Sequence, residues 1–382
     1  MRIFSQLLFL SLLCCACQSN SSLSLTQYQE SKISQQKPPF EVALPKELNT
    51  NKIDEIIENI SFIPLETTPD CLIATISDIK ADEDTLFIAD FRQVKQILVY
   101  DMSGNYLHRI SSLGAGPQEY INLSDIQIDT IKNHIYLLDG DQGKILVYDY
   151  MGNYQETILL PFKFVNHFLL GKNGIIYLEF GFRPNDCISP TNIVAYNTKK
   201  KKIIQSFFPY DNSLFKLRLK KNVFTTGSEN DYVWETLGNT VYRIESDSLY
   251  PLYRIAEKPY PFDFYGLTYR EIKEKCKNQN YTTLSNFFDL DDWYYARIDQ
   301  HNLSIHNFIN KSNNISIFDI SYLIDLHQKE VLLPEIFKLS GNQICSWIEA
   351  GMCKRIMMTP EKLKKLPEDN NPILVIYQMK HP

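Results

Sequence analysis

The sequence predicts an all-β fold, a six-bladed β-propeller of four-stranded antiparallel blades, and two observations carry this prediction. The first is a repeat: Tyr100, Tyr148 and Tyr196 follow one another at intervals of 48 residues, and Gly104 recurs as Gly152 at the same interval. The second is that each copy consists of apolar blocks rich in Ile, Val, Tyr and Phe, bounded by Gly, Asn, Asp or Lys turns. Such blocks are typical of strands joined by hairpins. Sheets that repeat every 40 to 50 residues or so are typical of propellers.

The part of the chain from about residue 60 to residue 380 has room for six such repeats, and we expect a single domain over residues 46–382. The predicted blades lie near residues 74–111, 123–160, 164–208, 213–256, 287–325 and 337–380. Residues 267–286 break the pattern and begin as an amphipathic helix, which predicts a short helical insertion. A strand at 60–65 cannot form a blade alone. We expect it to pair with the last blade near 373–377 and so close the ring.

Residues 1–16 have the features of a secretory signal. Arg2 is followed by an apolar run over residues 3–13, and Ala16 precedes Cys17. The run is shorter than the roughly 20 residues that a membrane-spanning helix needs. Residues 17–45 begin with a Ser-, Asn- and Gln-rich stretch, which predicts a flexible tether.

The end of this signal resembles a bacterial lipobox, in which the chain is cut before a cysteine that receives diacylglycerol. The matching residues are Leu13-Cys14-Cys15-Ala16-Cys17, with Cys14 where Leu is usual. The resemblance implies a lipid anchor on Cys17 and therefore a membrane as partner. The alternative is an ordinary secreted protein with a Cys-rich signal.

Composition and cysteine spacing exclude some classes of protein. A formal net charge of −6 argues against a nucleic-acid partner, which requires a concentrated basic surface. The cysteines after Cys17 match no zinc or redox motif; they are Cys71, Cys187, Cys276, Cys345 and Cys353. A Cys345–Cys353 disulfide across a hairpin is one interpretation, and buried free thiols are the favoured one.

Candidate ligand-binding residues lie in loops that a propeller places on one face. They are Asp90, Arg92, Glu119, Tyr120, Asp139, Asp141 and Arg183. Carboxylates and guanidinium groups can form charge-assisted hydrogen bonds with a sugar, a peptide or another small polar ligand, and tyrosine offers a stacking face. The alternative is structural, because Asp after a strand stabilises turns and the Gly and Pro residues of 114–120 fix a loop shape.

No catalytic constellation is present in the sequence. There is no Gly-x-Ser-x-Gly motif, and the seven histidines have no metal-ligand spacing. We therefore expect a non-enzymatic module that binds a ligand or a protein and needs no cofactor. The alternative is a calcium-assisted hydrolase or lyase, similar to lactonase propellers, that uses Asp and Asn side chains in the central channel.

Four segments carry a resemblance to a known family: 62–68 (FIPLETT), 97–110 (ILVYDMSGNYLHRI), 114–120 (GAGPQEY) and 371–380 (NPILVIYQMK). Together they resemble the six-bladed β-propeller lipoproteins of uncharacterised function, which are similar in shape to NHL-repeat propellers. The resemblance implies the fold, a lipid anchor and a place at the outer membrane of the cell envelope, facing the periplasm or the surface. It also implies a link to glycan or nutrient uptake, with a carbohydrate, a peptide or an envelope protein as partner.

Overall fold

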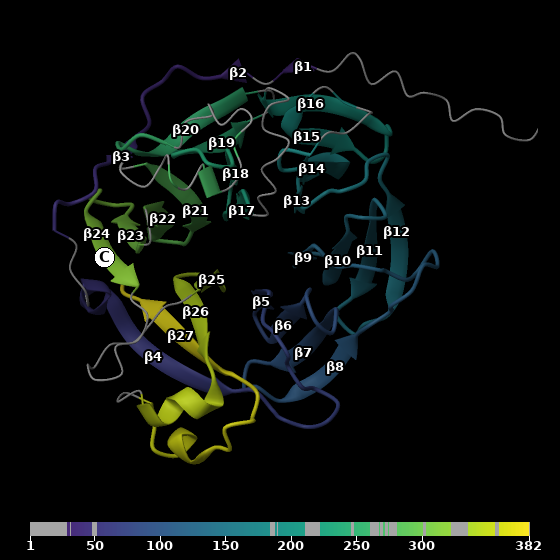
Figure 1. Ribbon diagram of the computed structural model, residues 1–382, viewed down its shortest axis with the longest axis vertical. Coiled ribbons are helices and arrows are strands. Elements are labelled where there is room, and N and C mark those ends of the chain that lie inside the picture. Colours follow the sequence, from purple (N-terminus) through teal and green to yellow (C-terminus); the bar gives the residue numbers. More distant parts are fainter. Residues whose placement is uncertain are drawn as a thin grey trace, which may run out of the picture.

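Six antiparallel sheets stand around a central axis as the blades of a propeller (Figure 1). The computed structural model describes residues 29–30, 32–47, 52–183, 188, 190–210, 222–245, 248–259, 267, 270–271, 274, 281–300, 303–321, 335–355 and 359–381. The prediction of a six-bladed propeller with four-stranded blades is confirmed.

The first three blades follow the predicted repeat closely. Blade 1 comprises β5 (Asp78–Asp82), β6 (Thr85–Asp90), β7 (Gln96–Asp101) and β8 (Tyr106–Ile110). Blade 2 comprises β9 (Asp125–Asp129), β10 (His134–Asp139), β11 (Lys144–Asp149) and β12 (Tyr154–Leu159). Blade 3 comprises β13 (His167–Leu170), β14 (Ile175–Glu179), β15 (Thr191–Asn197) and β16 (Lys202–Pro209).

The other three blades have the same order of strands. Blade 4 comprises β17 (Phe224–Thr226), β18 (Asp231–Trp234), β19 (Thr240–Glu245) and β20 (Ser248–Ile255). Blade 5 comprises β21 (Thr282–Asp289), β22 (Trp293–Gln300), β23 (Leu303–Asn310) and β24 (Ser316–Ser321). Blade 6 comprises β25 (Phe337–Lys338), β26 (Gln343–Ile348), β27 (Ile373–Met379) and the early strand β4 (Ile57–Pro64).

Strand β4 closes the ring as predicted. It pairs antiparallel with β27, from Ile373 opposite Pro64 to Met379 opposite Ile57. This pairing covers an edge of β27 that would otherwise leave its backbone groups unpaired.

The core lies between neighbouring blades, because the middle strands of a blade are buried on both faces. In one cluster Phe87 and Val99 of blade 1 pack with Ile126, Ile135 and Leu146 of blade 2. Residues facing either side of such a strand must be apolar. This explains why the sequence shows continuous apolar blocks there and not a strict alternation.

The segment before β4 runs along the outside of the disc (Figure 1). Strand β1 (Gln29–Glu30) pairs in parallel with β16, and β2 (Lys32–Ile33) and β3 (Phe40–Val42) pair in parallel with β20. The short 3-10 helix η1 (Lys52–Glu55) meets blade 5, where the Ile53 amide donates to Asp319 Oδ2 at 2.9 Å. We call the described residues 29–55 the N-terminal belt. Part of the segment expected to be a tether therefore pairs with the outer strands.

The predicted helical insertion is only a minor feature. Residues 282–286 belong to strand β21, so blade 5 begins earlier than expected. Residues 270, 271 and 274 are helical, and most of 260–280 lies outside the described residues. The described part of the chain contains no helix of seven or more residues, and none that is long and apolar enough to cross a membrane.

Three of the five cysteines beyond the signal are buried free thiols. They are Cys71, Cys345 and Cys353. Cys345 lies in β26 and Cys353 in the 3-10 helix η4 (Ala350–Arg355), so the two are not bonded across a hairpin. Cys187 and Cys276 lie outside the described residues.

Candidate functional site

A cavity of about 1320 Å³ runs along the axis of the disc, lined by the inner strands β5, β9, β13, β17, β21 and β25 and the loops beside them. We call it the channel. Its lining extends from the first residues of the inner strands to the turns that follow them, so it connects the two faces of the disc. We call these the loop face, which bears the links between second and third strands and between blades, and the turn face opposite.

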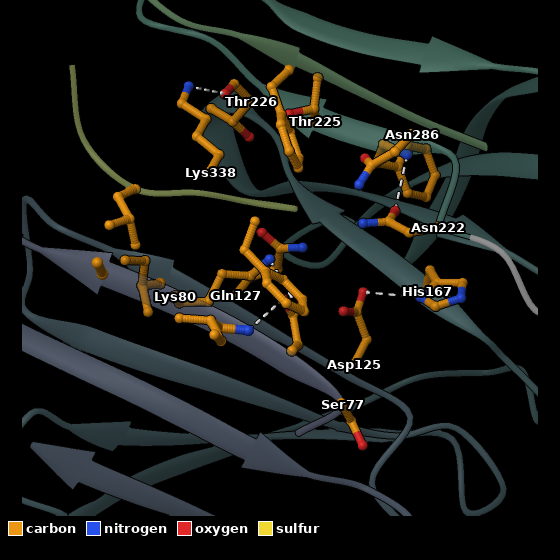
Figure 2. Close-up of a pocket in the computed structure, with 18 of the residues that line it drawn as sticks. Ser77, Lys80, Asp125, Gln127, His167, Asn222, Thr225, Thr226, Asn286 and Lys338 are labelled. Carbon is orange, nitrogen blue, oxygen red and sulfur yellow. Dashed lines mark hydrogen bonds and ion pairs between the residues drawn. The ribbon is translucent and has the colours of Figure 1, made fainter. Parts of the chain in front are cut away.

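Charged side chains of blades 1 to 3 meet near the loop face. Asp78 and Lys80 of β5 form an ion pair, with Lys80 Nζ 2.9 Å from Asp78 Oδ2. Asp125 of β9 points toward His167 of β13, as Figure 2 shows, and Asp125 Oδ2 lies 3.6 Å from His167 Nδ1. Gln127 Nε2 donates to the carbonyl of Phe168 at 3.1 Å. The strands position these groups, because Asp78, Asp125 and His167 are the first residues of three adjacent inner strands.

His167 is the member of this group with free hydrogen-bonding capacity. Neither ring nitrogen has a hydrogen-bond partner, although its side chain is only 15% exposed. Burial lowers the pKa of His167, but the negative charges of Asp125, Glu179 and Asp78 outweigh burial and raise the pKa above its ordinary value. The structure therefore holds a proton-binding side chain at the wall of the channel.

Glu179 lies behind His167. It is the cross-strand neighbour of His167 and is fully buried. Its Oε1 accepts the Gly181 amide, and its Oε2 has no hydrogen-bond partner. Burial raises the pKa of Glu179 to about 7, against the opposing effect of His167. A buried carboxyl with one unpaired oxygen is costly, and such groups gather at functional sites.

Lys338 of β25 crosses from blade 6 to blades 4 and 5. Its Nζ donates to the carbonyl of Thr226 at 3.0 Å, shown in Figure 2, and to the carbonyl of Asp289 at 2.6 Å. Burial lowers the pKa of Lys338, while the carboxylate of Asp289 opposes this effect. This lysine joins three blades at the channel wall.

Among the residues predicted from sequence, Asp90 and Asp139 hold loops in place. Asp90 Oδ1 accepts the Thr75 hydroxyl at 2.8 Å and the Gln93 amide at 2.9 Å. Asp139 Oδ2 accepts the Ile121 amide at 2.7 Å. Both carboxylates are buried, and neither is among the residues that line the channel.

Glu119 and Tyr120 also stabilise their own loop. Glu119 Oε2 accepts the Gly116 amide at 2.9 Å. Tyr120 is fully buried, and its hydroxyl donates to the carbonyl of Lys95 at 2.7 Å.

The three remaining predicted residues lie at or beside the channel. Arg92 lines the channel itself. Asp141 and Arg183 line a side pocket of about 170 Å³ that shares Asn166 with the channel wall. Asp141 Oδ2 accepts the Asn122 amide group at 2.6 Å, and the Arg183 guanidinium lies 5.5 Å from the centre of the Phe164 ring.

Sequence reasoning missed the inner-strand residues Asp78, Lys80, Asp125 and His167, and also Glu179. The repeat contained a signal for them: Asp78 and Asp125 are 47 residues apart, at the same position of successive copies. Glu179 ends the second strand of its blade, as Asp90 and Asp139 end theirs. Loops usually carry function, but here Asp78, Lys80, Asp125 and His167 lie on inner strands, and we call these four residues the polar cluster.

The chemistry of this cluster favours recognition by hydrogen bonds. Within the described ranges, no group of three His, Cys, Asp or Glu side chains could hold a metal ion. Asp78 and Asp125 each already face a basic side chain. These residues therefore give no observation that favours the calcium-assisted alternative, and they offer donors and acceptors to a polar ligand.

Comparison with known proteins gives one family and several related folds. The profile of a family described as "Domain of unknown function (DUF4934)" matches residues 40–378. A "Putative exported protein" from Bacteroides fragilis NCTC 9343 has a similar structure, with a TM-score of 0.71 and 18% identity over 90% of this chain and 99% of that chain. A member of the duf4221 family from Bacteroides vulgatus ATCC 8482 has a TM-score of 0.53 and 9% identity over 85% of this chain and 97% of that one. At these identities the likeness shows the fold alone. No curated protein matches the chain.

Proposed function

The chain belongs to the DUF4934 family of unknown function, and we propose that it is a non-enzymatic binding module of the cell envelope that holds a small polar ligand in the channel. The polar cluster at the loop face carries this proposal. Burying charged groups costs free energy, so the folding of a propeller does not explain why they are present. The inner strands of blades 4 and 6 begin with buried Phe224 and Phe337, where those of blades 1 to 3 begin with Asp78, Asp125 and His167.

The size and composition of the channel support the same proposal. Its volume exceeds the range of about 300–1,000 Å³ in which most small-molecule sites lie, so it has room for a ligand and for water. The lining combines the polar cluster with the aromatic side chains of Phe91, Phe288 and Trp347. Aromatic rings beside convergent polar groups are the usual composition of a ligand site.

For localisation we propose a lipid anchor at Cys17 that holds the propeller at the outer membrane. Residues 1–17, with their secretory signal and lipobox, support this proposal. The name of the Bacteroides fragilis neighbour also includes export. At the outer membrane we propose a role in glycan or nutrient uptake, with a carbohydrate, a peptide or an envelope protein as the bound partner.

The ligand proposal is tested with a soluble variant that begins after Cys17 and keeps every strand described above. Glycans, peptides and metabolites are screened by thermal shift, and each hit is measured by calorimetry. We expect His167→Gln and Asp125→Asn to weaken binding of a hit at least tenfold, because each removes a group at the channel wall. The control Glu156→Gln, an exposed residue of β12, should bind as the parent does. Turnover of a lactone or glycan with calcium would overturn the non-enzymatic proposal, and equal binding by all variants would overturn the site.

The anchor is tested separately in cells. We expect Cys17→Ala to move the protein from the membrane fraction to the soluble fraction, because no acyl chain can then be attached. Labelling with a radioactive fatty acid checks the modification directly. Continued membrane association of the unlabelled variant would contradict a lipid anchor.

A further inference from the structure

We propose that the side pocket next to the channel binds an α-amino acid, with the carboxylate of the amino acid on Arg183 and its ammonium group on Asp141. This inference rests on the proposed function and gives the class of ligand. The side pocket has a volume of about 170 Å³ and shares part of its wall with the channel, Phe91 and Asn166 included. The side chain of an amino acid held in the pocket can therefore extend into the channel.

Arg183 supplies the positive charge of the side pocket. Its backbone is held by hydrogen bonds, because its amide donates to the Phe180 carbonyl and its carbonyl accepts the Tyr210 hydroxyl at 3.1 Å. Its guanidinium lies over the Phe164 ring, 5.5 Å from the ring centre, and has no hydrogen bond or ion pair with any residue that the structure describes. The N–H donors of this group are therefore available to a carboxylate, which matches their geometry.

Phe164 is held in an unfavourable conformation beneath this guanidinium. Its φ of 61° lies in the left-handed region, which a bulky residue rarely adopts, and the residue is 48% exposed. Its amide donates to the Gly140 carbonyl at 2.6 Å, and a Cβ on Gly140 would lie 1.8 Å from the Val165 carbonyl oxygen. Such strain persists where the surrounding structure enforces it, as at ligand sites, and here it fixes an aromatic face under a cation.

Asp141 supplies the negative charge of the side pocket and does not pair with Arg183. Its Oδ2 accepts the Asn122 amide group at 2.6 Å, and no donor among the described residues contacts its Oδ1. The pocket therefore holds one cation and one anion that do not neutralise each other directly. A ligand that carries both charges can pair with each of them.

The rest of the lining suits the carbon atoms of an amino acid. Phe91, Leu123 and Val165 are its apolar members. Asn166 is only 5% exposed, and its side chain hydrogen-bonds to the carboxyl of Glu179 behind the wall. Apolar walls with a few convergent polar groups are the usual composition of a ligand site.

A zwitterion fits this pocket better than a molecule with a single charge. A carboxylate on Arg183 alone would leave Asp141 unpaired nearby, and an amine on Asp141 alone would leave the guanidinium unpaired. Each would add a like-charge contact, which costs affinity. The pocket holds the volume of about six water molecules, at about 30 Å³ each, which is room for the charged groups of one amino acid and not for a folded peptide.

Three small molecules that differ in charge test the inference: L-alanine, propionate, which lacks the ammonium group, and ethylamine, which lacks the carboxylate. Binding is measured by calorimetry at pH 7 on the variant that begins after Cys17. We expect L-alanine to bind at least tenfold tighter than either of the others, because each of them loses one charge-assisted contact. L-glutamine should bind at least as tightly as L-alanine, because its polar side chain can reach the channel.

Substitutions assign the two charges. Arg183→Gln and Asp141→Asn should each weaken L-alanine about tenfold. In Asp141→Asn we expect L-alanine and propionate to bind equally, and in Arg183→Gln we expect the same of L-alanine and ethylamine. The matched controls Arg109→Gln and Glu83→Gln change exposed charges outside both cavities and should have no effect. Circular dichroism confirms that each variant is folded.

The outcomes separate this inference from the proposed function. If a hit from the screen depends on His167 while L-alanine binds no tighter than propionate and ethylamine, the channel is a ligand site and the amino-acid inference is wrong. Equal binding of L-alanine by Arg183→Gln, Asp141→Asn and the parent would also overturn it. Binding of L-alanine that depends on Arg183 and Asp141, with no hit that depends on His167 or Asp125, would support the side pocket and overturn the polar cluster as the ligand site.

Discussion

At the scale of single residues, Glu179 gives a prediction about pH. Its pKa in the folded chain is about 7 because it is buried, well above the ordinary value of 4.5. The folded chain therefore keeps a proton on Glu179 where the unfolded chain has lost it, and stability falls as the pH rises from about 4.5 to about 7. We expect Glu179→Gln to match the parent protein near pH 4.5 and to be more stable at pH 8, by up to about 3 kcal/mol.

Urea unfolding at half-unit pH steps checks this prediction. Glu156→Gln serves as the control, because Glu156 is exposed on β12, and its stability difference from the parent should not change with pH. A Glu179→Gln difference that is the same at every pH would show that Glu179 ionises normally in the fold.

Lys338 gives a second prediction at this scale, since one ammonium group joins three blades. In Lys338→Met the carbonyls of Thr226 and Asp289 each lose a donor, while the methionine keeps the apolar stem. We expect a loss of about 2 kcal/mol in the free energy of unfolding, because both carbonyls lose a charged donor and the Asp289 carbonyl is partly buried. Lys354→Met is the matched control: its ion pair with Glu368 is exposed, so it should cost less than about 0.5 kcal/mol. Equal costs for the two variants would show that Lys338 does not join the blades.

At the scale of elements, the sequence repeat offers two equivalent turns in which the same substitution can be compared. Gly104 and Gly152 occupy the same turn of blades 1 and 2, with φ of 86° and 83°. A Cβ on Gly104 would lie 2.3 Å from the carbonyl oxygen of Pro64, whereas a Cβ on Gly152 would lie 3.2 Å from its nearest neighbour, a His108 ring atom. We expect Gly152→Ala to cost about 1–2 kcal/mol for the left-handed backbone alone. Gly104→Ala should cost about 2 kcal/mol more, because the turn must also move away from β4. Urea unfolding compares them, and equal losses would show that the contact with β4 is loose.

The strands and turns of blades 1 to 3 could be predicted from sequence because they repeat. The blocks ending in Tyr100 and Tyr148 lie in β7 and β11, and the Gly turns after them follow as expected. Blade 5 was placed too late, since residues 282–286 continue a strand with no matching copy elsewhere. Short pairings such as β1 with β16 left no pattern in the sequence, because two residues of parallel backbone pairing require no particular side chains.

The candidate site was harder to predict than the fold. Asp90 and Asp139 follow strands, and such residues bind either a ligand or their own loop; the structure shows hydrogen bonds to the loop. Asp125 and His167 come from different blades, 42 residues apart, and no local pattern indicates that they meet. Only the closed ring brings the first residues of β9 and β13 together. Contacts between residues of different blades can be predicted from a sequence only after the sequences of the blades are aligned with one another.

At the scale of the whole molecule, closure and the N-terminal belt are separable, and this gives the last prediction. The belt contributes strands of two or three residues on blades 3 and 4, whereas β4 pairs with β27 along seven residues. A chain that begins at residue 29 keeps both features and should melt at the temperature of the parent. A chain that begins at residue 56 loses the belt, and we expect a monomer that melts a few degrees lower.

A chain that begins at residue 66 also loses β4, and for it we expect more than a lower melting temperature. The edge of β27, whose side chains are almost all buried, would become an unpaired strand edge, which is a template for pairing with other chains. We expect this variant to associate, as measured by light scattering during size-exclusion chromatography. A monomer with the melting temperature of the 56–382 chain would show that five blades and a three-stranded sixth are sufficient. In that case β4 would cover an edge without being needed to hold the ring closed.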